Sequence, residues 1–236
     1  MIRDGKVIGE RSETTRRRHN ERLPGLVSGV LAECGVEPVR IEAIAVSIGP
    51  GSFTGLRVGL SFAKGMALGL GVPIVPVGSL EALAAALAGK IAPPGEELSE
   101  GDLLCPMTVA RRGESFAQLF IVTDGVLVRR GEPFLTDGSG IASRSDAPVW
   151  SGGEGADALA ESIARFPDGV RYVPGVSASA GTVGLIGDGF RRDASHSLKS
   201  IGELEPVYIK EFTVKRRIQR EGRSMSAFRE DHSARG

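Results

Sequence analysis

The stretch SIGPGSFTGLR, residues 47–57, decides the fold of this chain. Alternating apolar residues at positions 44, 46 and 48 lead into it and predict a strand, whereas the sequence from residue 53 onward favours a helix. Between them, Pro50 fixes its own φ and has no N–H, while Gly49 and Gly51 permit backbone angles and close approaches that a side chain would forbid. The stretch therefore predicts a strand, a tight glycine turn and a helix start.

The end of this stretch predicts how the helix begins. Ser52 is the expected N-cap, because its hydroxyl can accept a hydrogen bond from the first helical turn. Such a turn leaves amides at a helix N-terminus, which can hold an anion, a carboxylate or a neighbouring backbone. Arg57 opposes the helix dipole, so we expect a carboxylate or anion near it. The residues of this turn, as an anion site or a structural element, are Ser47, Gly49, Pro50, Gly51, Ser52, Phe53, Thr54 and Arg57.

Composition bounds the class of protein. The chain has 236 residues, of which 41% are hydrophobic and 25% are charged, and 29 basic residues balance 29 acidic ones. Such a chain can bury a sizeable core as one large or two small domains. A formal net charge of zero excludes the strongly basic balance expected of a chain that alone holds a long nucleic acid.

Cysteine content and hydropathy indicate the compartment. The two cysteines, Cys34 and Cys105, are too few for a disulfide framework or a zinc site, which fits a reducing cytoplasm. No stretch approaches the roughly 20 apolar residues that span a bilayer, and the first residues do not read as a signal peptide. We expect a cytoplasmic protein that does not enter a membrane.

The first part of the chain alternates strands and helices. An Asp4-Gly5 turn opens it, and the apolar spacing of residues 16–34 is that of one helical face. Strands that alternate with helices imply a largely parallel sheet. The predicted strands are 6–11, 44–48 and 74–77, and the predicted helices are 16–34, 53–70 and 79–88.

The second part predicts an antiparallel meander followed by further strand and helix. Residues 91–100, IAPPGEELSE, have the composition of a linker or exposed loop. We therefore predict domains at 1–98 and 99–210, with a basic, flexible tail at 211–236. The predicted strands are 103–111, 115–122, 126–130, 148–150 and 170–173, and the predicted helices are 155–166 and 177–190.

An internal repeat relates the two parts. IRDGKVIGERSE, residues 2–13, parallels IVTDGVLVRRGE, residues 121–132. Two strands precede the Asp-Gly turn of the second copy, whereas only Met1 to Arg3 precede that of the first. We expect the first half to lack its N-terminal two strands, which leaves an exposed sheet edge. Either the natural chain starts upstream of Met1, or the protein folds with a reduced first sheet.

The helix predicted after the glycine turn carries a ridge of small residues. They recur every four positions, with larger apolar residues beside them. Such a ridge lets a second helix approach closely. It can equally pack on the chain's own sheet, so the residues alone leave both interpretations open. The ridge consists of Gly55, Gly59, Ala63 and Ala67, and Leu56, Leu60 and Met66 lie beside it.

The sequence contains no recognised catalytic or metal-binding motif. The histidines, His19, His196 and His232, are far apart, and Leu23 stands where an H-x-x-x-H pair would need a second histidine. The glycine turn lacks the lysine of the G-x-x-x-x-G-K-[ST] phosphate loop. We therefore predict no catalytic residue, no metal site and no cofactor.

SIGPGSFTGLRVGLSFAKGMALGLGVPIVPVGSLEALA, residues 47–84, resembles the signature segment of the TsaB (YeaZ) family. Proteins of this family are needed to make threonylcarbamoyladenosine in transfer RNA. Further stretches are similar to the family pattern, and the resemblance extends to about Lys210. These stretches are HNERLP at 19–24, ARRGE at 110–114 and EPVY at 205–208.

The resemblance implies an α/β fold of two ribonuclease-H-like halves, the architecture of the actin-like ATPases (ASKHA). Family members are similar to the catalytic subunit TsaD but lack its metal-binding histidines. They act as its partner in a complex that also contains the ATPase TsaE. The implied role is a scaffold subunit without catalytic activity of its own, which forms a homodimer when alone and meets transfer RNA only indirectly.

The resemblance also favours the interface interpretation of the small-residue ridge. In TsaB-like proteins the helices corresponding to 16–34 and 53–70 meet their counterparts from TsaD, or from a second copy, as a helical bundle. The interface residues implied here are Gly55, Leu56, Gly59, Leu60, Ala63, Met66 and Ala67 of the second helix, with Leu23, Leu26 and Val30 of the first.

Two departures from the family pattern bear on function. Val109 stands where the family usually has an aspartate before Ala110, which removes a carboxylate from that turn. The Asp-Thr-Ser strand end, which faces phosphate in the actin-like ATPases, is absent. The alternative functions, an ATP-binding phosphotransferase or ATPase of the same fold and a glycoprotease-like peptidase, are therefore less favoured.

Overall fold

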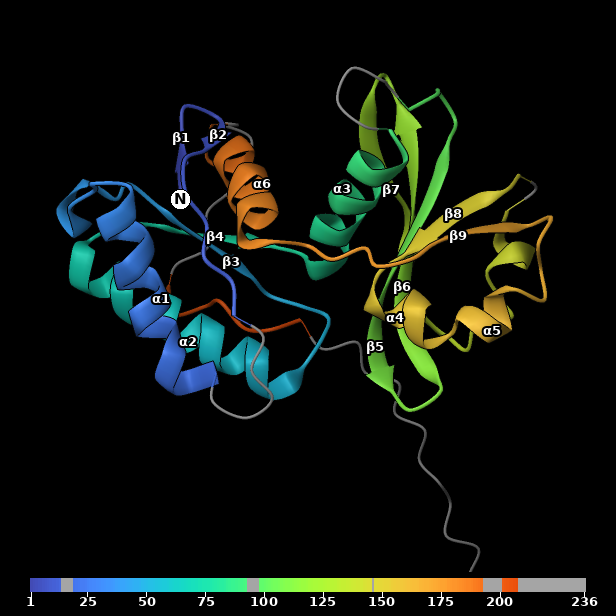
Figure 1. Ribbon diagram of the computed structural model, residues 1–236, viewed down its shortest axis with the longest axis horizontal. Coiled ribbons are helices and arrows are strands. Elements are labelled where there is room, and N and C mark those ends of the chain that lie inside the picture. Colours follow the sequence, from blue (N-terminus) through green and yellow to red (C-terminus); the bar gives the residue numbers. More distant parts are fainter. Residues whose placement is uncertain (14–18, 93–97, 146, 193–200, 208–236) are drawn as a thin grey trace, which may run out of the picture.

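Two lobes lie side by side in the computed structural model of the chain (Figure 1). The structure describes residues 1–13, 19–92, 98–145, 147–192 and 201–207. Helices α3 (Ser79–Ile91) and α6 (Ala180–Arg192) contact each other between the lobes. No helix within these described ranges is long and apolar enough to cross a membrane.

The N-terminal lobe contains two separate two-stranded sheets. One is the antiparallel hairpin β1–β2, and the other is the parallel pair β3–β4. Helix α2 packs on one face of β3 and α6 on the other, because the side chains of Val46 and Ala45 alternate between the faces. The elements are β1 (Ile2–Arg3), β2 (Lys6–Val7), α1 (His19–Glu33), η1 (Pro38–Arg40), β3 (Ile44–Ser47), α2 (Phe53–Leu70) and β4 (Ile74–Val77).

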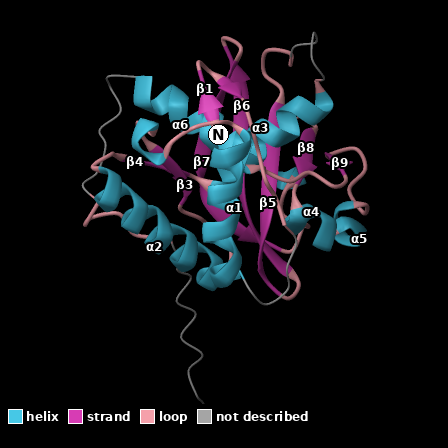
Figure 2. Ribbon diagram, turned by 60° about the vertical axis from the view of Figure 1, so that its left-hand side comes forward, coloured by secondary structure: helices cyan, strands magenta, loops and turns pink. Residues whose placement is uncertain are grey.

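The C-terminal lobe is built on one mixed five-stranded sheet with strand order β7-β6-β5-β8-β9 (Figure 2). The meander β5–β6–β7 is antiparallel, and β8 joins β5 in parallel. This sheet confirms the predicted α/β class. The elements are β5 (Leu103–Arg111), β6 (Glu114–Thr123), β7 (Val126–Thr136), η2 (Ala142–Arg144), β8 (Val149–Gly152), α4 (Glu154–Ala158), α5 (Ala160–Ile163) and β9 (Val170–Val173).

Helices α3 and α6 each pack on the sheet that lies on the other side of the predicted domain boundary. Helix α3 precedes β5 in the chain, yet Leu80 and Leu87 are buried against Leu104 and Phe120 of the C-terminal sheet. Helix α6 follows β9 but packs on β3 and β4. Packing therefore crosses the boundary predicted at residues 98 and 99 in both directions.

The internal repeat is visible in the two hairpins. Asp4 and Gly5 have φ values of 51° and 70°, and Asp124 and Gly125 have 51° and 72°. Positive φ at both central residues is the geometry that joins two strands tightly. In the C-terminal lobe this hairpin continues into β5 and β8, whereas no described strand lies between β1–β2 and β3. That the first half lacks two strands remains a prediction.

Several predicted boundaries differ from the structure. The strand predicted at 6–11 is limited to Lys6–Val7, and the last helix begins at Ala180 instead of 177. The helix predicted at 155–166 is divided into α4 and α5, because Leu159 has the non-helical angles φ −114° and ψ 14°. The basic tail predicted at 211–236 lies outside the described residues.

Candidate functional site

The glycine turn after β3 is tied to three other segments. The N–H of Ile48 donates to the carbonyl of Val77 (2.9 Å), and the N–H of Ser79 donates to that of Gly49 (2.8 Å). The N–H of Val207, near the end of the described chain, donates to the Ile48 carbonyl (2.7 Å). Strand β4, helix α3 and the C-terminal segment therefore hold the turn before the chain enters α2.

Gly49 has a steric reason to be glycine. The residue is buried, and its φ of 108° is a conformation that side chains disfavour. A Cβ at this position would lie 2.8 Å from the carbonyl oxygen of Val207 and 3.0 Å from Cδ1 of Leu56. A side chain would therefore displace the C-terminal segment from the turn.

The start of α2 agrees with the predicted cap. The hydroxyl of Ser52 accepts a hydrogen bond from the N–H of Gly55 (3.3 Å), which confirms Ser52 as the N-cap. The guanidinium of Arg57 lies 3.9 Å from the centroid of the Phe53 ring, a cation–π contact. Glu205 lines the same cavity of about 270 Å³ as Arg57. An anion bound at Arg57 remains a prediction.

A cleft of about 330 Å³ lies between the glycine turn and the C-terminal lobe. On the turn side, the hydroxyl oxygens of Ser47 and Ser79 are 2.7 Å apart. On the opposite side, the hydroxyl of Thr108 donates to Oε1 of Glu154 (2.8 Å). The predicted turn residues that line the cleft are Ser47, Pro50, Gly51 and Ser52.

The charge of this lining is poorly matched to phosphate. Among the described residues around the cleft, Glu154 is the one ionisable side chain. Phosphate groups are usually held by backbone amides together with Lys, Arg or a metal ion, and a nearby carboxylate repels them. The cleft therefore favours the structural interpretation of the glycine turn over the anion-binding one.

A second glycine turn, not singled out from the sequence, follows β8. Gly153 has φ 110°, and a Cβ there would lie 2.3 Å from the carbonyl oxygen of Met107. A Cβ on Gly155 would lie 2.8 Å from the Met107 carbonyl carbon and from Oγ of Ser115. The run SGGEG at 151–155, directly after an apolar strand, was the signal that could have revealed it.

Part of the predicted interface on α2 lies inside the protein. Leu60 and Ala63 are each 4% exposed, and Ala67 is fully buried. They pack with Ile74 of β4 and with Leu204 in one core cluster. This corrects the predicted surface, because these side chains stabilise the chain's own sheet and are not accessible to a partner.

The accessible surface of α2 is the opposite side of the helix. Leu68 is 68% exposed, and Val58, Phe62 and Met66 are half-buried. We call this surface the outward face of α2; it consists of Val58, Phe62, Gly65, Met66, Leu68 and Gly69. Among the other predicted interface residues, Gly55 is exposed, and Leu56, Gly59, Leu23, Leu26 and Val30 are half-buried.

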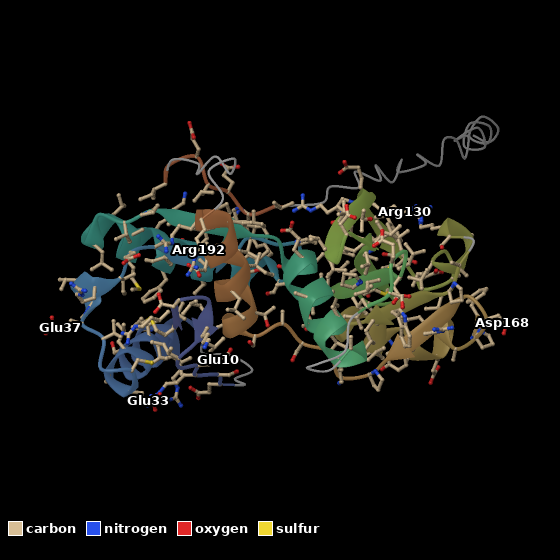
Figure 3. All side chains as sticks on the ribbon, turned by 90° about the horizontal axis from the view of Figure 1, so that it is seen from above. Glu10, Glu33, Glu37, Arg130, Asp168 and Arg192 are labelled. Atoms are coloured by element: carbon tan, nitrogen blue, oxygen red, sulfur yellow. The ribbon has the colours of Figure 1, made fainter. Side chains whose placement is uncertain are left out.

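The strongly perturbed titratable groups lie away from the cleft. Complete burial in the C-terminal core raises the pKa of Cys105 to about 12. Desolvation, together with the hydrogen bond from its hydroxyl to Asp157 (2.7 Å), raises the pKa of Tyr172 to about 12. The charged residues Glu37 and Asp168 lie at opposite ends of the molecule (Figure 3).

Potential metal ligands do not gather anywhere in the part of the chain that the structure describes. No group of three or more His, Cys, Asp or Glu side chains is close enough there to hold a metal ion. His196 and His232 lie outside the described residues, as does the side chain of His19.

The comparisons first define the class of protein. Residues 7–123 match the family model described as "TsaD: tRNA N6-adenosine threonylcarbamoyltransferase". Two solved structures from Pseudomonas aeruginosa, one named YeaZ and one described as similar to the peptidase YEAZ, share the fold. Each has a TM-score of 0.65 at 24% identity, over 84% of this chain and 87% of its own. The chain therefore has an actin-like, ribonuclease-H-like α/β fold.

Sequence relatives narrow this class. TsaB of Bacillus subtilis, a "tRNA threonylcarbamoyladenosine biosynthesis protein", is 32% identical over 152 residues, which are 63% of this chain and 62% of the relative. TsaB of Haemophilus influenzae is 39% identical over 75 residues, 32% of each chain. The chain thus spans less than two thirds of either relative. Together with the YeaZ structures, these relatives confirm the predicted resemblance to the TsaB/YeaZ family.

An enzyme, a tRNA threonylcarbamoyltransferase, is also similar to this chain, over a shorter stretch. A tRNA N6-adenosine threonylcarbamoyltransferase of Thermus thermophilus is 37% identical over 110 residues, which are 40% of this chain and 34% of the relative. The similarity to that enzyme and the TsaD family model both concern only part of the chain.

Proposed function

We propose that this chain is a non-catalytic scaffold subunit of the machinery that forms threonylcarbamoyladenosine next to the anticodon of transfer RNA. In this proposal it supports a TsaD-like catalytic subunit through its helices α1 and α2. The names of the relatives support the pathway. The observation that carries the docking role is the outward face of α2, which presents apolar and glycine residues to solvent.

The outward face of α2 has the composition of a helix–helix contact. Leu68 is largely exposed, and Phe62 and Met66 offer further apolar area. Gly65 and Gly69 have no atoms within 4 Å of an added Cβ, so a second helix can approach the backbone there. Burial of this face would remove apolar surface from water, which is the main driving force of protein association.

Similarity to TsaD indicates which partner fits. The TsaD family model matches residues 7–123, a range that contains both α1 and α2. A TsaD-like protein would therefore present a related helix pair, and two such pairs can pack as a four-helix bundle. The same complementarity would allow two copies of this chain to form a homodimer when no TsaD-like subunit is present.

The remaining parts of the proposal rest on the family resemblance. A TsaE-like ATPase would join through the complex, and transfer RNA would be met only indirectly, in the cytoplasm. The chain would bind no cofactor and would hold two ribonuclease-H-like halves, the first of them reduced. No Lys or Arg is among the described residues that line the cleft, which supports the scaffold role over the rival ATPase, because a positive side chain usually helps to hold nucleotide phosphates.

Co-purification with a TsaD-like protein from the same cell tests this function. Gly65→Arg places a long charged side chain on the outward face of α2, and we expect it to abolish the association. Gly89→Arg is the matched control, because Gly89 is also an exposed helical glycine with no atoms within 4 Å of an added Cβ. Failure of the wild-type chain to associate, or full binding by Gly65→Arg, would refute the proposal.

A nucleotide titration separates the scaffold from the rival ATPase. We expect no saturable binding of ATP to the isolated chain at millimolar concentration. Micromolar affinity would favour the ATPase instead.

A further inference from the structure

Helix α2 carries its charge on one side. Its sequence, FTGLRVGLSFAKGMALGL, contains the cations Arg57 and Lys64 and no acidic residue. The seven positions between them are about two helical turns, so both side chains leave the helix on the same side. Helix α2 lies at the periphery of the N-terminal lobe beside α1 (Figure 1 and Figure 2). A partner that packs along this side therefore meets two positive charges.

The charged side adjoins the outward face of α2. Lys64 precedes Leu68 by one helical turn, so the two side chains are neighbours on the helix surface. Leu68 is 68% exposed and belongs to the outward face, whereas Leu60 and Ala67, on the other side of Lys64, are buried. Lys64 therefore lies at the border between the core and the proposed docking surface. A helix that covers Leu68 comes within reach of the Lys64 ammonium group.

The charge of Lys64 is not neutralised within the described structure. The side chain is half-buried, and no ion pair among the described residues involves its ammonium group. Glu205 lines the same cavity of about 270 Å³ as Lys64 and Ser61, yet it is not one of the described ion-pair partners either. Further burial of a half-buried ammonium costs free energy unless a carboxylate pairs with it. A partner that covers this border therefore needs to supply negative charge.

A second copy of the chain is poorly suited to supply this carboxylate. Helix α2 has no acidic residue. Among the side chains of α1 that the structure describes, the one carboxylate is that of Glu33, which already pairs with Arg11 (2.5 Å). Two copies that pack through α2 would place the cations of both copies in one interface. Like charges in an interface oppose association.

We propose that Lys64 selects the partner of this chain by charge. This inference rests on the proposed function: the helix that packs on the outward face of α2 carries an Asp or Glu side chain that pairs with Lys64. Arg57, which is stacked on the Phe53 ring, adds to the positive potential on the same side. A helix without such a carboxylate leaves the Lys64 ammonium covered and without a counter-charge, which discriminates against it. The chain therefore binds an acidic helix of a TsaD-like subunit in preference to a second copy of itself.

Charge reversal in the full chain tests this selection. At low ionic strength, Lys64→Glu should weaken binding to the TsaD-like protein from the same cell by about tenfold or more. Lys64→Met removes the charge but keeps a long unbranched side chain, and it should weaken binding about fivefold. Arg112→Glu is the matched control, because Arg112 is an exposed cation in the β5–β6 turn and its reversal changes the net charge equally. Equal loss of affinity in Lys64→Glu and Arg112→Glu overturns the proposal.

A second control separates a carboxylate of the partner from one of the chain itself. If the chain's own Glu205 neutralised Lys64 in the complex, Glu205→Gln would weaken binding as much as Lys64→Met does. We expect the affinity of Glu205→Gln to stay within about twofold of the wild-type value. Equal losses in Glu205→Gln and Lys64→Met overturn the proposal.

Rescue by the partner identifies the carboxylate. The Asp and Glu residues on the partner helices that correspond to α1 and α2 are replaced by Lys one at a time. One replacement should restore the affinity of Lys64→Glu and weaken that of the wild-type chain, as expected for a direct pair. Absence of rescue at every position overturns the proposal.

Self-association provides a further readout. Sedimentation equilibrium of the wild-type chain alone should give a homodimer at least about tenfold weaker than the complex with the TsaD-like protein. A homodimer as tight as that complex overturns the selection.

The two proposals fail in different ways. If the wild-type chain does not associate with the TsaD-like protein, the proposed function is wrong. If it associates, and Gly65→Arg abolishes binding while Lys64→Glu leaves it intact, the docking surface stands and only the selection by charge is wrong.

Discussion

Strand β5 of the C-terminal lobe is buried from Leu103 to Thr108, whereas strand β3 of the N-terminal lobe is partly exposed along its whole length. Leu104 and Met107 in β5 have no exposed surface, whereas every residue of β3 is partly exposed. Both lobes contain an Asp-Gly hairpin and a parallel strand pair followed by a glycine turn. Among the described strands, β5 is paired on both edges, whereas β3 pairs with β4 alone.

The largest expected effect on stability comes from a substitution in the core of the C-terminal lobe. Leu104→Ala removes a fully buried side chain that packs against Leu87 and Phe120, and we expect it to lower the free energy of unfolding by about 3 kcal/mol. Leu26→Ala in α1 should cost less than about 1 kcal/mol, because Leu26 is half-exposed. Urea denaturation measures both, and equal losses would contradict the contrast between the lobes.

An intermediate effect concerns the two glycine turns. Gly49→Ala and Gly153→Ala each force a side chain into a positive-φ conformation and against a backbone carbonyl, so each should destabilise by about 2 kcal/mol or more. Gly59→Ala on α2 is the matched control, since nothing lies within 4 Å of its added Cβ. It should stabilise by up to about 1 kcal/mol through helix propensity. Thermal melts of the three variants measure these changes in stability. A turn variant as stable as the wild-type chain would contradict the steric interpretation of that glycine.

The smallest expected effect is a difference in chemical labelling between the two thiols, one in each lobe. Cys34 on the α1 side is partly exposed, whereas Cys105 in β5 is completely buried. At pH 8 a thiol reagent should label Cys34 in the folded chain and Cys105 only after unfolding. Equal labelling rates in the folded chain would mean that the C-terminal core opens as readily as the N-terminal lobe.

The buried thiol of Cys105 predicts a pH dependence of the free energy of unfolding. The pKa of Cys105 is raised to about 12 in the folded chain from an ordinary value of 9.0, so the unfolded chain loses this proton first. The stabilisation is complete below pH 9 and declines as the pH rises from there toward 12. Between pH 8 and 10 it should fall by about 1 kcal/mol. Cys105→Ala should remove this component from the pH profile of chemical denaturation.

Local features were predictable from the sequence because their causes lie within a few residues. Ser52 caps α2 through a backbone amide three residues away, and the Asp4-Gly5 turn needs only its own positive φ angles. The bounds of α2 were predicted as the structure has them, since the glycine turn starts the helix and Gly71 in the left-handed conformation ends it.

Features that depend on distant residues were missed or misplaced. The inward side of α2 is chosen by Leu204 and Ile74, which no helical periodicity can reveal, so Ala63 and Ala67 were wrongly assigned to the partner surface. The Thr108–Glu154 pair in the cleft joins residues 46 positions apart and was not predicted. The repeat predicted an exposed sheet edge, which remains a prediction; among the described strands, β3 pairs only with β4.

The sequence by itself determined the α/β class, the glycine turn, the repeat and the resemblance to the TsaB/YeaZ family, because motif chemistry and hydrophobic spacing are local properties. The tertiary structure alone decided that α3 and α6 pack across the predicted boundary, and that one side of α2 belongs to the core and the other to solvent. These outcomes depend on contacts between residues that are far apart in the sequence, and those contacts determine which side chains are buried.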